Sequence, residues 1–234
     1  AGLTDHPCPC WLSRLPDPAG GFFKTLGADG SAVPEPRRTT LVQARLTYVF
    51  AHAYVLSSDD TFRRAAEHGL AFLVRALRGD DGGFLRAATA DGRVLDATRD
   101  AYDQAFVLFA LAWVYRATRD AGTIQLADAT WSAMQRQLSD RQYGGFQEQY
   151  APDQLDLKLP RRQNPHMHLL EAVLALYAAT GEKNWLRRAI ALAPGHANEH
   201  SGLGILLLMR GVLGEGWDEY EWRPRSRGRQ GSRS

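Results

Sequence analysis

The sequence Gly-Gly-Phe occurs three times, 62 residues apart each time, and this spacing constrains the fold more than any other feature of the chain. The copies are Gly20-Gly21-Phe22, Gly82-Gly83-Phe84 and Gly144-Gly145-Phe146. A fixed period of this length indicates one supersecondary unit repeated along the chain, and it argues against a doubly wound sheet or a sandwich. Equivalent positions can therefore be compared within this one sequence.

Each copy is followed by turn residues and then by two helical segments. Asp29-Gly30 and Asp91-Gly92 predict hairpins between short extended segments, and the third copy has Pro152-Asp153 instead. The first helix of each pair is apolar around most of its circumference, which is typical of a buried helix; we predict these helices over 41–56, 101–117 and 165–179. A more amphipathic second helix is predicted over 61–77, over 123–138 and from residue 184 onward.

Capping residues precede the buried helices. Thr40 and Asp100 are expected to cap the first two, and Asn164 the third, with Pro165 as its first helical residue. All three buried helices are then expected to point the same way, with their N-termini and the Gly-Gly-Phe hairpins at one mouth.

The repeat predicts an all-α fold of the (α/α)6-barrel type. Such a toroid commonly closes with six pairs of inner and outer helices, whereas this sequence supplies about three pairs, so we expect an incomplete ring over 11–193. The residues Leu203-Gly204, Gly211, Glu215-Gly216 and Tyr220 fall at tetratricopeptide offsets and predict one further helix pair over 194–222. The Arg-rich segment 223–234 is expected to be disordered.

Charge and cysteine content exclude several classes of protein. Five of the 28 basic residues lie in 223–234, so the rest carries 23 basic against 26 acidic residues and a net charge of −3. This does not favour a nucleic-acid-binding fold. No apolar run is long enough for a membrane span, and no signal peptide is evident, so we expect a cytoplasmic protein. Cys8 and Cys10, even with His6, give three metal ligands at most, and we predict no metal site.

Polar residues stand in the first turns of the predicted buried helices, where packing alone would not select them. They are Gln43 and Arg45, then Tyr102, Asp103 and Gln104, then Asn164, His166, His168 and Glu171, with Arg161 and Arg162 just before the third helix. His168 and Glu171 are three residues apart and share a helix face, whereas His166 points elsewhere. A histidine near a helix N-terminus is favoured as a neutral base, and an arginine can stabilise a developing oxyanion. Proton abstraction beside a carbonyl needs these groups.

Each of these residues also has a structural interpretation. His168 and Glu171 can form a purely structural pair, and Arg45 can be the partner of a loop acid. Asp103 and Gln104 are interpreted as capping groups at the helix start, and His166 as structural. The convergence of three repeats on one mouth favours a functional site there.

The segment from Asn164 to Ala172, Asn-Pro-His-Met-His-Leu-Leu-Glu-Ala, resembles the signature of the N-acylglucosamine 2-epimerase family. Gln43-Ala44-Arg45 and the segment from Tyr102 to Phe106 match the family's earlier motifs in order and spacing. The resemblance covers about residues 11–190. It implies an (α/α)6 barrel that moves a proton at C2 of an aldose without a metal or organic cofactor, with a monosaccharide or small oligosaccharide as substrate.

The resemblance also implies roles for individual residues. His168 acts as an acid/base and Glu171 supports it, while Arg45, Tyr102, Gln104, Asn164 and Arg162 bind the sugar. The family's second catalytic histidine comes from the other half of its barrel. This chain is therefore expected to be an isomerase or 2-epimerase, inactive if that half is required.

Two other functions stay open at this point. One is a helical protein-interaction module, in which the tetratricopeptide-like segment and the Arg-rich tail would bind a partner protein. The other is an (α/α)6 glycoside hydrolase, with Glu171 and Asp103 as its two carboxylates. An open half-ring would also expose apolar helix faces, which predicts self-association through its open side.

Overall fold

The computed structural model describes residues 12–142, 144–152 and 162–192. The chain divides into two compact units, Ala1–Ala172 and Val173–Ser234, and each is considered by itself. Helix α6 (Gln163–Thr180) begins in the first unit and ends in the second.

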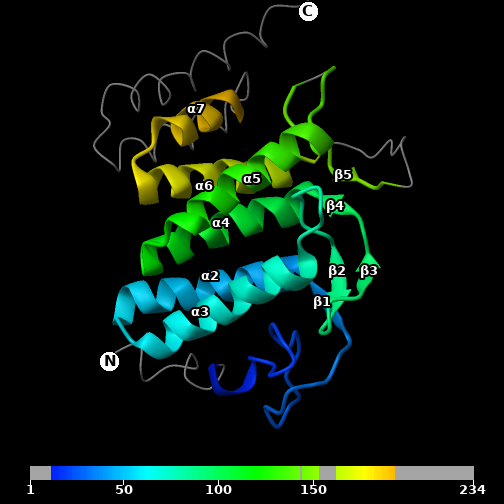
Figure 1. Cartoon of the computed structure of the whole chain (residues 1–234), viewed down its shortest axis with the longest axis vertical. Coiled ribbons are helices and arrows are strands. Elements are labelled where there is room, and N and C mark those ends of the chain that lie inside the picture. The colour runs from blue at the N-terminus through cyan, green and yellow to red at the C-terminus, as the bar shows by residue number, and fades with distance from the viewer. Residues whose placement is uncertain (1–11, 143, 153–161, 193–234) are drawn as a thin grey trace, which may run out of the picture. The chain divides into compact units, whose positions relative to one another are not determined.

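The first unit contains two complete pairs of helices. Helix α2 (Thr40–Ser57) packs against α3 (Asp60–Phe72), which continues into a π-helical segment, η2 (Leu73–Leu77). Helix α4 (Ala101–Thr118) packs against α5 (Ala121–Leu138). Because α2 and α4 also pack against each other, the first helix of each repeat forms an inner layer. Both inner helices begin at the end of the unit that carries the strands (Figure 1).

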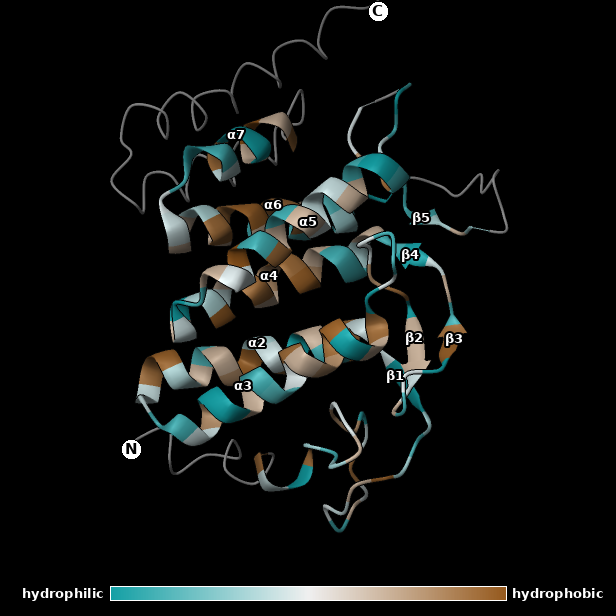
Figure 2. Ribbon diagram, viewed as in Figure 1, coloured by the Kyte–Doolittle hydropathy of each residue, from teal (hydrophilic) through white to brown (hydrophobic). Residues whose placement is uncertain are grey.

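The inner and outer helices differ in composition as their packing requires. Helix α4 is mainly apolar, whereas hydrophilic residues are frequent in α3 (Figure 2). Phe50 and Ala51 of α2 pack with Phe62 and Ala66 of α3 in a core that also holds Phe22. Removing this apolar surface from water is the main contribution to the stability of the unit.

Short strands connect consecutive repeats. Strands β1 (Arg37–Thr39), β2 (Ala87–Thr89) and β3 (Val94–Asp96) form an antiparallel sheet in that order, with Arg37 opposite Thr89. Strand β4 (Arg99–Asp100) pairs with β5 (Gln149–Tyr150), and Arg99 lies opposite Tyr150. Since β1 leads directly into α2 and β4 into α4, these pairings fix the N-terminal ends of the inner helices.

The phenylalanine of each Gly-Gly-Phe copy is buried, and a side chain from the following inner helix holds its backbone. Gln43 donates to the Phe22 carbonyl at 2.9 Å and accepts from its N–H at 2.7 Å. Gln104 makes the same two bonds to Phe84, at 2.8 and 2.9 Å. These bonds satisfy backbone groups that would otherwise be buried without partners.

The third repeat replaces this glutamine by a histidine. The N–H of Phe146 donates to Nε2 of His166 at 3.1 Å, which supports the structural interpretation of His166. In the first repeat, Gly21 has φ of +72°, and a Cβ atom there would lie 2.6 Å from Oε1 of Gln43. Glycine is therefore required both by the backbone conformation and by the close approach of the glutamine.

The predicted helices are confirmed, but two of the predicted caps are wrong. Asp100 caps α4 as expected, accepting from the N–H of Tyr102 at 2.9 Å. The N-cap of α2 is Thr39, because strand β1 keeps the backbone extended up to that residue, and Thr40 is the first helical residue. Helix α6 begins at Gln163, so Asn164 lies inside the helix rather than before it.

The described part of the second unit includes α7 (Lys183–Leu192), which presents one buried face made by Trp185, Leu186, Ala189 and Leu192. The predicted tetratricopeptide-like pair over 194–222, the tail over 223–234 and both cysteines lie outside the described residues. No helix among the described residues is long and apolar enough to cross a membrane.

Candidate functional site

A pocket of about 430 Å³ lies in the first unit, where the N-terminal ends of α2, α4 and α6 come together. The predicted convergence of the three inner helices on one mouth is therefore observed. The polar part of its lining includes Arg37, Arg86, Asp100, Tyr102, Asp103, Gln149, Arg162 and Asn164. Three of these residues, Tyr102, Asn164 and Arg162, were predicted from the sequence as sugar-binding residues.

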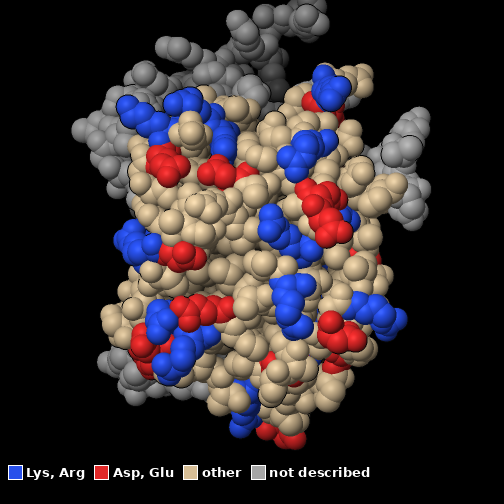
Figure 3. All heavy atoms as spheres, in the orientation of Figure 1, with Lys and Arg blue, Asp and Glu red and all other residues tan. Residues whose placement is uncertain are grey.

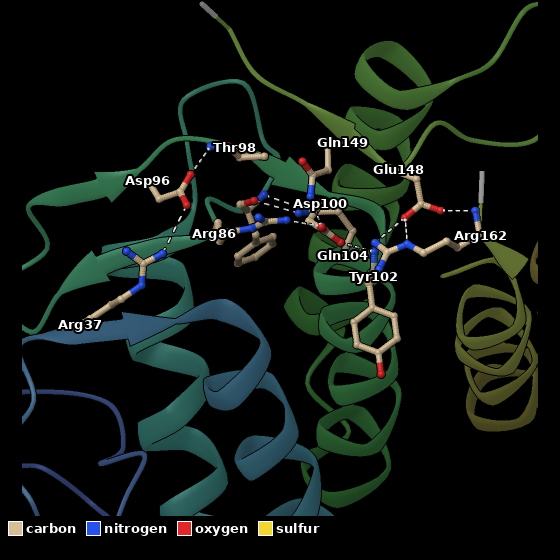
Figure 4. Close-up of polar contacts among 11 residues, drawn as sticks. Arg37, Arg86, Asp96, Thr98, Asp100, Tyr102, Gln104, Glu148, Gln149 and Arg162 are labelled. Carbon is tan, nitrogen blue, oxygen red and sulfur yellow. Dashed lines mark hydrogen bonds and ion pairs between the residues drawn. The ribbon is translucent and has the colours of Figure 1, made fainter. Parts of the chain in front are cut away.

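Ion pairs hold the loops around this pocket, and Figure 4 shows them above the start of α4. Asp100 accepts from the guanidinium of Arg86 and, at 2.8 Å, from the side-chain amide of Gln149. Glu148 accepts from Nε and Nη2 of Arg162 at 2.9 and 2.7 Å. The charge-assisted hydrogen bond from Gln149 to Asp100 joins the third repeat to the second, and the other two ion pairs lie within one repeat each.

His168 and Glu171 form a pair one turn apart on α6. Nδ1 of His168 lies 2.8 Å from Oε2 of Glu171, and the two side chains are 23% and 49% exposed. Because a carboxylate accepts from Nδ1–H, the contact favours the tautomer in which Nε2 can accept a proton. Nε2 has no hydrogen-bond partner among the described residues. His168 is the sixth residue of α6, so Glu171, rather than the field of the helix terminus, orients its ring.

Two aromatic residues of α4 connect this pair to α2. Arg45 donates from Nη2 to the hydroxyl of Tyr102 at 2.8 Å, and its guanidinium carbon lies 4.3 Å from the centre of the Phe106 ring. The His168 ring is 5.1 Å from the ring of Tyr102 and 5.0 Å from that of Phe106, measured between centroids. Arg45 of α2 and His168 of α6 therefore contact the same two side chains of α4, Tyr102 and Phe106.

The internal repeat accounts for this arrangement. Arg45, Phe106 and His168 each follow, by two residues, the side chain that holds a Gly-Gly-Phe backbone. They occupy the same position in three consecutive inner helices, so they lie at the same level. No role was predicted for Phe106, which is the last residue of the second family motif. An alignment of the three repeats would have predicted its place between Arg45 and His168.

Gln104 is placed differently from the other predicted sugar-binding residues. The residue is 1% exposed, and the amide oxygen and nitrogen of its side chain both bond the backbone of Phe84. Both polar groups of Gln104 are therefore used to hold the hairpin backbone, and Gln104 does not line the pocket. Arg162 and Asn164 do line the pocket, although the guanidinium of Arg162 is also held by Glu148, a residue that the sequence analysis missed.

Asp103 does not act as a capping group, because Asp100 caps the helix. It is 6% exposed, lines the pocket, and makes no hydrogen bond or ion pair within the described part of the chain. Burial, together with the nearby charge of Asp100, raises the pKa of Asp103 to about 7. A buried carboxyl group of this kind is characteristic of functional sites, although structural networks also produce it.

Comparison with known proteins gives the family to which the chain belongs. The sequence profile of the family N-acylglucosamine 2-epimerase (GlcNAc 2-epimerase) matches residues 21–207. The chain belongs to this family, and the resemblance seen in the sequence is confirmed. The match runs past residue 194 and gives no support to a tetratricopeptide-like segment beginning there.

Individual relatives agree with the family. The chain is 38% identical over 178 residues to a mannose-6-phosphate isomerase of Rhizobium meliloti, covering 74% of this chain and 44% of that protein. It is 33% identical to a D-mannose isomerase of Thermobifida fusca, with 73% and 42% covered. The structure of cellobiose 2-epimerase from Spirochaeta thermophila superposes with a TM-score of 0.72 at 28% identity, over 81% of this chain and 50% of that one.

The chain spans about half the length of the relatives that it matches. It is mostly helical, and it corresponds to about half of an (α/α)6-barrel epimerase. The fold class predicted from the repeat is confirmed to that extent.

Proposed function

We propose that this chain catalyses proton transfer at C2 of an aldose, with His168 as the acid/base. The observation that supports this most directly is the contact of His168 with Glu171 at 2.8 Å, which leaves Nε2 available on a ring that contacts Tyr102, the hydrogen-bond partner of Arg45. A base and a fork of hydrogen-bond donors within one cluster are the two requirements for forming an enediol from an α-hydroxy aldehyde.

The reaction proceeds through the open-chain sugar. Nε2 of His168 takes the proton from C2, and the electrons of the C–H bond move to form an enediolate with its negative charge on O1. The guanidinium of Arg45 and the hydroxyl of Tyr102 donate to this oxygen, while Glu171 stabilises the imidazolium. Return of the proton from His168 to C1, with transfer of the O2 proton to O1, gives the 2-ketose.

The number of bases distinguishes isomerisation from epimerisation. One base can take the proton from C2 of the aldose and return it to C1 of the resulting cis-enediol on the same face, so one base suffices for the ketose. Epimerisation returns the proton to C2 on the opposite face and needs a second group there. The other described histidines are engaged elsewhere: His52 with Tyr48, His68 with the Gly21 carbonyl, and His166 with Phe146. The described residues therefore favour an aldose–ketose isomerase over a 2-epimerase.

Mannose is the first substrate to test. The relatives are described as acting on mannose, mannose 6-phosphate and cellobiose, which share an aldose end with a C2 proton. Mannose 6-phosphate and cellobiose differ from a simple hexose mainly in the groups they carry away from C1 and C2.

We expect the chain, incubated with mannose in D₂O, to form fructose carrying deuterium at C1 and to exchange the C2 proton of mannose. NMR of the sugar detects both labels. Glucose as the first product would indicate epimerisation instead. A folded sample that exchanges no proton of mannose, fructose or N-acetylglucosamine would contradict catalysis by this chain. Release of reducing sugar from a β-linked disaccharide would favour a glycoside hydrolase.

A further inference from the structure

The guanidinium groups that line the pocket are already paired with carboxylates. Nη2 of Arg37 lies 3.3 Å from Oδ2 of Asp96, and Nη2 of Arg162 lies 2.7 Å from Oε2 of Glu148. Arg86 pairs with Asp100. Acidic and basic side chains also lie next to one another over the face of the molecule seen in Figure 3. These arginines offer donors to a ligand, but their positive charge is balanced before a ligand arrives.

Asp103 adds a carboxyl group that forms no ion pair among the described residues, although the charges of Arg86 and Arg45 act on it from further away. It is 6% exposed, it faces the pocket, and no hydrogen bond or ion pair to it is found among the described residues. A buried polar group without a partner is costly, and a hydroxyl group of a ligand would supply the missing hydrogen bond. A phosphate dianion would instead stand close to a group that carries a negative charge when it is ionised.

The pocket and the proton-transfer cluster share one side chain. Tyr102 lines the pocket, accepts from Arg45 and contacts the ring of His168. His168 and Arg45 are not part of the pocket lining, so we place C1 and C2 of the sugar at His168 and its remote carbons past Tyr102, in the pocket beside Asp103.

We propose that Asp103 is a specificity-determining residue, which makes this pocket accept the hydroxyl groups of an unphosphorylated sugar and reject a phosphate ester. The inference rests on the proposed function, because it takes the ligand to be an aldose. The paired arginines donate to hydroxyl oxygens, and Asp103 accepts from a hydroxyl group. A phosphate dianion finds no uncompensated cation in the described lining, and it is repelled by Asp103.

The charge of Asp103 makes the rejection dependent on pH. Its pKa of about 7 results from burial and from the charges of Asp100 and Asp96, opposed by those of Arg86 and Arg45. As the pH rises from 6 to 8, Asp103 loses its proton, so the penalty for a phosphate ester increases. The phosphate itself also ionises near pH 6, and a variant without the carboxyl group separates the two effects.

The experiment compares the binding of mannose and mannose 6-phosphate to the full chain by calorimetry at pH 8. We expect mannose to bind about tenfold tighter, from the repulsion between like charges in a partly buried site. Asp103→Asn should weaken mannose binding and strengthen mannose 6-phosphate binding, and it should remove the additional rejection that appears between pH 6 and 8. Asp80→Asn, at an exposed position, is the matched control and should change neither affinity.

Asp103→Asn is expected to change the affinities for mannose and mannose 6-phosphate in opposite directions. Misfolding of the variant would instead weaken the binding of both sugars. Tighter binding of mannose 6-phosphate to the unmodified chain would overturn the inference and leave the proposed function standing. An equal loss of both affinities in Asp103→Asn would also overturn it. Failure of the unmodified chain to bind either sugar would overturn the inference and the proposed function together.

Discussion

Replacing His168 by Gln should lower the rate of C2 proton exchange in mannose by about 10²- to 10⁴-fold, the usual contribution of a positioned general base. Glutamine preserves a polar side chain that can contact Glu171, but it cannot take up a proton from carbon. The change should appear in kcat, because the substitution leaves in place Arg45 and Tyr102, which we propose to bind the sugar. Exchange is measured by NMR in D₂O.

His68→Gln is the matched control for this substitution. His68 lies on α3, where its Nε2 is 2.8 Å from the Gly21 carbonyl, and a glutamine amide can donate to the same oxygen. The exchange rate of this variant should stay within about twofold of the unmodified chain. Equal rates for His168→Gln and the unmodified chain would exclude His168 as the base.

Replacing Asp103 by Asn should raise the free energy of unfolding at pH 8 by up to about 4 kcal/mol and leave it nearly unchanged at pH 4. The folded chain holds the Asp103 proton with a pKa of about 7, against 3.8 as the ordinary value. A group with a raised pKa stabilises the fold below its unfolded pKa, and this stabilisation is lost as the pH rises through about 7. The limit of about 4 kcal/mol corresponds to the difference between a pKa of about 7 and the ordinary value of 3.8.

Denaturant unfolding at pH 4, 6 and 8 measures this effect. Asparagine keeps the shape of the side chain and part of its desolvation cost, so the observed gain should fall below the limit. Asp80→Asn, at an exposed position, should change stability equally little at all three pH values. A difference between Asp103→Asn and the unmodified chain that did not grow with pH would show that Asp103 is not a buried carboxyl of raised pKa.

The helical architecture could be predicted from the sequence because it depends on local patterns. Asp91-Gly92 produces the turn between β2 and β3 as expected, and Asp100 caps α4. The start of α2 was predicted one residue late, because its position depends on the pairing of β1 with β2, a strand about 50 residues further along the chain.

The candidate site was only partly predictable, for a related physical reason. The contact of His168 with Glu171 follows from helical spacing, and it was expected. The roles of Gln104 and Glu148 depend on partners in other segments, Phe84 and Arg162, which a single helix pattern does not reveal. Asp103 was interpreted as a cap because it stands in the first turn, and its burial depends on the neighbouring repeats.

The proposed function requires His168 to lie at the sugar site, and one measurement tests this independently of turnover. The chain has seven histidines, whose side chains can be labelled with ¹⁵N and observed by NMR, with His168→Gln assigning the resonance. Addition of mannose should shift the imidazole resonances of His168 and leave those of His68 unchanged. Sugar binding, detected on the ligand, without any shift of His168 would contradict the account.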